Sequence, residues 1–277
     1  MRLNRFRWIN TIAFLLMVTV NAAANLIPIG IGTTGEISDL YRNLFTPAPI
    51  TFAIWGVIYF LLAIFVLYGW GILDRGRQSG NVIEGIGIWF AVSCFLNIGW
   101  IFAWHFNQMT LSVLLIAGLL VSLVMIVGKL KNMQGTNVLD SVAADAGFQL
   151  YFGWIIAATI ANVSVLLTKA GWNGFGLSPV LWTCLVLVVG ALIGATAAVL
   201  NKKCLPTVAI IWAYVGILFE HMSAGGYNGK YFGVILTIIL CLVLMILSIF
   251  AVFFYRLNTE ADDEDNCSVC QIHSYKT

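Results

Sequence analysis

Residues 40–68 read LYRNLFTPAPITFAIWGVIYFLLAIFVLY, a proline-punctuated segment that leads into a long apolar run. Pro47 and Pro49 stop a helix from continuing through this segment, because proline lacks an N–H and restricts the residue before it. In the apolar run, Tyr59 follows Trp55 by four residues, so both rings share one face of a helix. The stretch therefore predicts a loop poised over an aromatic helix face, as a lid over a pocket would be.

The rest of the chain is similarly apolar. Of its 277 residues, 61% are hydrophobic and 9% are charged, whereas a soluble domain carries about 25% charged residues. Apolar runs of roughly 20 residues, long enough to cross a bilayer, recur without the alternation of a membrane barrel. The predicted fold is all-α, a polytopic membrane helix bundle of about eight transmembrane helices. The expected spans are residues 8–30, 50–73, 82–104, 109–128, 142–168, 178–200, 205–223 and 231–255.

The basic residues predict the orientation of these spans. They gather in alternate connections, on the side of the N-terminus, which is the positive-inside pattern. Both termini are therefore expected to be cytoplasmic, with the cell membrane as the expected location. The expected inner basic residues are Arg2, Arg5, Arg7, Arg75, Arg77, Lys129, Lys131, Lys202, Lys203 and Arg256. An alternative is that the first span is a cleaved signal peptide, which would leave seven spans.

Polar residues within the spans gather at one depth. Following the chain direction places them in the outer half of spans one, two, three and five, below the longest outer loop. Each amide alone is most simply an interhelical hydrogen bond. Together with aromatic rings, amides at one depth indicate a cavity for a large, flat, mostly apolar ligand. These residues are Asn21, Asn25, Trp55, Tyr59, Asn97, Trp100 and Asn162, with Trp154 lower, near mid-span.

Several of these residues stand at spacings that are typical of one family. The motifs are Tyr41-x-x-Leu44 before Pro47, Trp55-x-x-x-Tyr59, Asn97-x-x-Trp100, and Tyr151-x-x-Trp154 followed by Ala158 and Asn162. Over residues 8–170 this pattern resembles the TspO/MBR family of translocator proteins and tryptophan-rich sensory proteins. Thr46-Pro47-Ala48-Pro49 departs from it, since the family has a Lys-Pro, a tryptophan and a double proline there.

The resemblance implies a five-helix bundle, often dimeric, with a pocket open toward the first outer loop. Members of the family bind porphyrins, haem and, in some cases, sterols. The pocket residues implied by matched position are Trp55, Tyr59, Asn97, Trp100, Trp154, Ala158 and Asn162. Asn21 and Asn25 join them from the depth argument, and the loop from Leu44 through Pro47 to Pro49 would gate access.

The chain continues beyond that five-helix unit, which we assign to residues 1–170. Residues 171–256 predict three additional transmembrane helices, and residues 257–277 predict an acidic, disordered cytoplasmic tail. Gly190-x-x-x-Gly194 in span six has the small-residue spacing of a dimer face in membrane helices, so a homodimer is one expectation.

The favoured function is therefore a sensor or carrier that binds a tetrapyrrole, such as haem or a porphyrin, or a sterol in an outer-half cavity. A secondary transporter of a small hydrophobic molecule is the alternative, with the additional helices completing its path. An intramembrane enzyme using His105, Glu220 and His221 is a third hypothesis. No catalytic residue and no required cofactor is assigned. No metal site is assigned either, because Cys267, Cys270 and His273 offer three ligands and a structural zinc site needs four. The expected partners are the lipid bilayer and the hydrophobic ligand, and no clustered basic face for nucleic acid is found.

Overall fold

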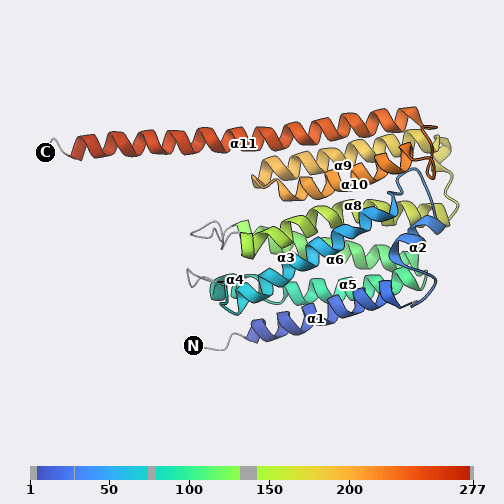
Figure 1. Ribbon diagram of the computed structural model, residues 1–277, viewed down its shortest axis with the longest axis horizontal. Helices are drawn as coiled ribbons and strands as arrows, with labels where there is room; N and C mark the ends of the chain where they lie inside the picture. The colour runs from blue at the N-terminus through green and yellow to red at the C-terminus, as the bar shows by residue number, and fades with distance from the viewer. Residues whose placement is uncertain (1–4, 28, 74–78, 132–141, 275–277) are drawn as a thin grey trace.

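A computed structural model describes residues 5–27, 29–73, 79–131 and 142–274, and every regular element within these ranges is a helix (Figure 1). Side chains are described as far as Tyr255, except at Asn201. The α-helices are α1 (Arg5–Leu26), α2 (Thr34–Leu40), α3 (Ile54–Gly69), α4 (Ser79–Ile86), α5 (Trp89–His105), α6 (Met109–Lys131), α8 (Gly147–Lys169), α9 (Pro179–Asn201), α10 (Leu205–Met222) and α11 (Phe232–Ser274). Short 3₁₀ turns cover Pro49–Ala53 and Gly174–Gly176, and a π-helical turn, Val142–Ala146, precedes α8.

The helices lie side by side along one axis, which confirms the predicted polytopic bundle. Within the described ranges, seven are long and apolar enough to cross a membrane. The predicted third span is divided, because α4 and α5 meet at a bend of 56°. Gly87, at this bend, has φ +61°, a left-handed conformation that glycine adopts without steric cost. Counting the bent pair as one crossing gives eight spans.

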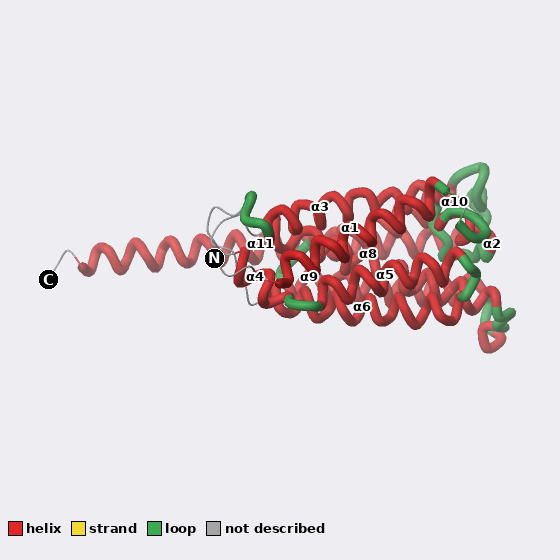
Figure 2. Tube along the Cα trace, turned by 90° about the horizontal axis from the view of Figure 1, so that it is seen from below, coloured by secondary structure: helices red, strands yellow, loops and turns green. Residues whose placement is uncertain are grey.

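The two ends of the bundle differ. The start of α1 and the end of α11 lie at one end, which we call the inner end, and α2 and the loops around it lie at the opposite, outer end (Figures 1 and 2). The backbone of α11 continues as helix to Ser274, well past the other helices, where the sequence predicts a disordered tail. The side chains of that tail, including Cys267, Cys270 and His273, lie outside the described residues.

The helices after residue 170 pack directly on the five that precede them. Helix α10 lies against α8, and Gly153 of α8 is so close to the backbone of Pro206 that a Cβ atom at Gly153 would overlap the Pro206 carbonyl. Near the outer end, the Ala48 N–H donates to the Gly216 carbonyl at 3.1 Å. These contacts make the additional helices part of one bundle.

The small-residue motif of α9 also serves packing within the chain. A Cβ atom at Gly190 would lie 2.6 Å from the Tyr214 hydroxyl of α10. The Thr207 hydroxyl donates to the Gly194 carbonyl at 2.7 Å. Both glycines therefore face α10 of the same chain, and they do not form a dimer face. The expected homodimer stays a prediction that this motif no longer supports.

Candidate functional site

A cavity of about 400 Å³ lies between α1 and α3 in the outer half of the bundle. This volume is within the usual range of small-molecule sites, about 300–1,000 Å³. Most of its wall is apolar or aromatic, and its polar groups come from α1, α2 and the aromatic face of α3. The lining residues are Val18, Asn21, Ala22, Asn25, Leu26, Thr34, Phe52, Ala53, Trp55, Gly56 and Tyr59.

Trp55 is the centre of the aromatic wall. Its ring stacks on Tyr59 at 5.5 Å between centroids, as their four-residue spacing on α3 requires. Across the helix interface it contacts Trp100 of α5 at 5.9 Å, and Tyr151 and Trp154 of α8 at 5.7 and 6.0 Å. Such offset and edge-to-face pairs give a rigid wall, because aromatic contacts add to the packing energy of the rings.

Asn97 of α5 connects the amides behind this wall. Its Oδ1 accepts a hydrogen bond from Asn21 Nδ2 at 2.6 Å, and its own Nδ2 donates to the Tyr151 hydroxyl at 3.0 Å. Asn25 Nδ2 donates to the Asn21 carbonyl at 2.9 Å, one turn nearer the outer end of α1. Asn97 is fully buried, so this chain of bonds fixes α1, α5 and α8 relative to one another beside the cavity.

Three buried donors in this region make no hydrogen bond among the described residues: the Tyr59 hydroxyl and the indole N–H groups of Trp100 and Trp154. A buried polar group without a partner costs free energy, more so in hydrocarbon, where water cannot replace the missing partner. An acceptor on a bound molecule that reached these groups would remove that cost.

The structure divides the predicted site residues into three sets. Asn21, Asn25, Trp55 and Tyr59 line the cavity, and Asn97, Trp100 and Trp154 contact these lining residues. The remaining four, Leu44, Pro47, Ala158 and Asn162, do not line it.

Asn162 instead connects α8 to α6, where its Oδ1 accepts from the Ser112 hydroxyl at 2.8 Å. Ala158 is partly buried against the core. The sequence did not single out Val18, Ala22 or Gly56 for the site, since small apolar residues carry no signal in an apolar helix.

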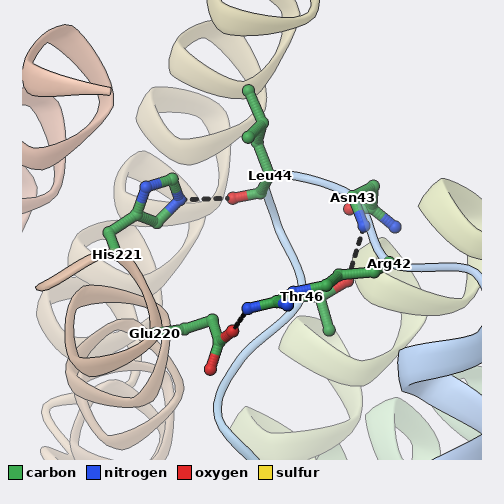
Figure 3. A network of polar contacts seen from close by, with 6 residues as sticks. All are labelled: Arg42, Asn43, Leu44, Thr46, Glu220 and His221. Carbon is green, nitrogen blue, oxygen red and sulfur yellow. Dashed lines mark hydrogen bonds and ion pairs between the residues drawn. The ribbon is translucent and has the colours of Figure 1, made fainter. Parts of the chain in front are cut away.

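The predicted lid is fixed to α10 (Figure 3). Arg42 forms an ion pair with Glu220, and His221 Nε2 is 2.9 Å from the Leu44 carbonyl oxygen, to which it donates. Tyr227, beyond α10, stacks on His221 at 4.7 Å and lies under the Arg42 guanidinium at 4.8 Å. The segment over the cavity is α2, whose Thr34 lines the cavity while its carbonyl accepts from the Trp104 indole at 3.1 Å.

The three residues of the enzyme hypothesis, His105, Glu220 and His221, each contact other parts of the protein. Glu220 and His221 each bind the outer loop, and His105 Nδ1 lies 2.8 Å from the Ile101 carbonyl in its own helix. The second ring nitrogens of both histidines, His105 Nε2 and His221 Nδ1, are buried and make no hydrogen bond among the described residues. No cluster of three or more metal-ligating side chains occurs within the described ranges.

The Arg42–Glu220 pair is expected to restrain the loop more than it stabilises the fold. Replacing Glu220 by glutamine removes the charge and should speed hydrogen–deuterium exchange of amides 41–48. The loss of stability should stay near 1 kcal/mol or less, because Arg42 is partly exposed. The matched control is Glu36→Gln, which lies on the outer side but bonds only within its own turn, to Thr33. Equal exchange of the loop in both variants would contradict the restraint.

Comparison with known families agrees with these observations. The family model described as TSPO-like protein matches residues 7–254. No curated protein and no solved structure matches the chain. The family match continues past residue 170, so it includes α9, α10 and the membrane-spanning part of α11 together with the helices around the cavity. This multi-pass membrane protein therefore belongs to the TSPO-like protein family.

Proposed function

We propose that this protein binds a flat hydrophobic molecule in the cavity between α1 and α3, and acts as a sensor or carrier for it. The observation that carries the proposal is the Trp55 cluster, which forms an aromatic wall on a cavity of about 400 Å³. The favoured ligand class is a tetrapyrrole such as haem or a porphyrin, with a sterol second, because the chain belongs to the TSPO-like family. The cell membrane is the proposed location.

The side chains divide the work of binding. The ring of Trp55, held by Tyr59 and Trp100, offers apolar area and stacking to the ligand face. Asn21 and Asn25 supply amides at the outer part of the cavity and would orient polar edges of the ligand. The unpartnered indole N–H groups of Trp100 and Trp154 add donors behind the wall.

A ligand would reach this cavity between the helices. Ala22 of α1 and Gly56 of α3 both line the cavity and are exposed at the surface of the bundle. Small residues at both positions leave a gap there, and a Cβ atom at Gly56 would meet no atom within 4 Å. The fixed loop at Leu44 makes access from the outer end less direct, so we assign access to the lipid-facing side.

Gly56→Phe tests the site by filling it. Gly56 lines the cavity and a Cβ atom there meets no atom within 4 Å. We therefore expect the affinity for protoporphyrin IX, followed by tryptophan fluorescence quenching in detergent, to fall at least about tenfold, or about 1.4 kcal/mol. Cholesterol in competition with the porphyrin would rank the two ligand classes.

The matched control is Gly128→Phe. Gly128 of α6 is likewise an exposed helical glycine with no atom near a Cβ position, and it lies outside the cavity. Its affinity should equal that of the unmodified protein. Unchanged porphyrin binding in Gly56→Phe would refute the site.

A transporter remains the rival function. It predicts saturable, gradient-dependent uptake of the ligand into vesicles that contain the purified protein. Binding that is blocked by Gly56→Phe, without such uptake, would favour the sensor.

A further inference from the structure

A second hollow lies on the side of the bundle, between α8 and α9. It is a groove of about 440 Å³ and is lined by apolar side chains, with the Thr196 hydroxyl as the polar exception. Several of its residues are more than 40% exposed, among them Val189, Leu192 and Leu200. The lining residues are Phe152, Ile156, Val189, Leu192, Ile193, Thr196, Ala197 and Leu200.

The segment of α9 that lines the groove is about as long as one bilayer leaflet is thick. Helix α9 begins at the outer end and ends at Asn201, so the segment from Val189 to Leu200 is its inner half. At 1.5 Å per residue this segment extends about 16 Å, and half of a hydrocarbon core is about 15 Å thick. A fatty acyl chain lying along the groove would therefore reach from the inner interface to about the middle of the membrane.

Positive charge stands at the inner end of the groove. The Lys131 ammonium at the end of α6 donates to the carbonyl of Leu200, a groove residue, at 3.3 Å. Lys202, two residues beyond Leu200, lies with its ammonium 4.4 Å above the Tyr255 ring. Lys131 is exposed, whereas the Lys202 ammonium also donates to the Tyr255 hydroxyl of α11 at 3.3 Å and Lys203 is paired with Asp145. An ammonium has three donors, so Lys131 can hold the carbonyl and a phosphate oxygen together.

We propose that this groove binds an anionic phospholipid of the inner leaflet. One acyl chain lies along the inner half of α9, and Lys131 holds the phosphate at the interface. Basic pockets between transmembrane helices on the cytoplasmic side recognise such headgroups. Free phosphate would gain only the contact with Lys131 and none of the apolar groove. A second copy of the chain is a less suitable occupant, because a symmetric pair would bring the two Lys131 charges together at the inner end of the groove.

Native mass spectrometry of the full-length protein tests the proposal, with dioleoyl phosphatidylglycerol and dioleoyl phosphatidylcholine added in equal amounts. We expect one phosphatidylglycerol to be retained preferentially. Lys131→Gln should weaken the retention of phosphatidylglycerol about fivefold, because one basic residue near an anionic lipid surface strengthens binding by about that factor. Lys230→Gln, which removes an exposed lysine from the outer side, is the charge-matched control.

A second pair of variants tests the groove itself. Leu192→Trp fills it and should reduce retention of phosphatidylglycerol, whereas Leu240→Trp, at a leucine of α11 that is also more than half exposed and lies outside the groove, should not. Melting temperatures of all four variants would show that each is folded.

Three results would overturn the proposal. The first is equal retention of the two lipids, and the second is equal loss in Leu192→Trp and Leu240→Trp. The third is displacement of the lipid by glycerol phosphate alone, which would indicate a site for a free anion.

Discussion

A Gly153→Ala variant is expected to melt well below the unmodified protein in detergent. The added Cβ atom would overlap the carbonyl oxygen, carbonyl carbon and Cα of Pro206, all of them backbone atoms of α10. A side-chain neighbour could rotate away, but backbone can yield only if α8 and α10 move apart. Overpacking of a tight interface costs about 1–3 kcal/mol, and more where the structure cannot relax.

Gly128→Ala is the control for this substitution. It makes the same change inside a helix, at a position where a Cβ atom meets nothing within 4 Å. Because alanine favours helix over glycine by up to about 1 kcal/mol, this variant should melt at the same temperature or higher. If the two variants melted alike, the close contact of α8 with α10 would be wrong. The argument that α9, α10 and α11 form one bundle with the first five helices would then fail.

The helical architecture could be predicted from hydropathy alone, because each span must satisfy its own backbone in hydrocarbon. The bend between α4 and α5 could not. Gly87 is one glycine among many in this chain, and nothing in its neighbours indicates a φ of +61°. Gly190 and Gly194 show the same limit, since their spacing predicts a close helix neighbour without saying whether that neighbour is another chain or α10.

The sequence predicts at what height in the membrane the site residues lie, but only partly which of them face the cavity. Chain direction and the helical rise fix the height of a residue in the membrane, and Asn21, Trp55 and Tyr59 do meet at one height around the cavity. Asn162 also belongs to the outer half, yet it faces Ser112 of α6. Which face of a helix meets the cavity depends on how its neighbours pack, and an almost uniformly apolar helix carries little signal for that.

The loop illustrates a third limit, which is sequence separation. A polar, proline-containing segment between two spans predicts an outer loop, and the structure has one. Its attachment depends on Arg42 and Glu220, which are 178 positions apart, and on His221 beside them. From the sequence alone, Arg42 is interpreted as a solvated charge, and Glu220 and His221 are interpreted as residues at the boundary of a span. Only the packing of α10 against the five-helix unit brings them together.

Asn97→Leu should combine a large loss of stability with a loss of ligand affinity. Leucine fills similar space but leaves the Asn21 amide without its Asn97 acceptor and the Tyr151 hydroxyl without its donor, both buried. Each such group costs about 1–3 kcal/mol, so a total of about 2–6 kcal/mol is expected for the two, measured as a lower melting temperature. Asn21 lines the cavity, so the affinity for protoporphyrin IX should fall as well.

Asn162→Leu is the matched control, because Asn162 is also fully buried. Its Oδ1 accepts one hydrogen bond, from Ser112, and its Nδ2 has no partner among the described residues. It should lose less stability and no affinity, and a porphyrin affinity lowered equally in both variants would remove the amide chain from the binding site.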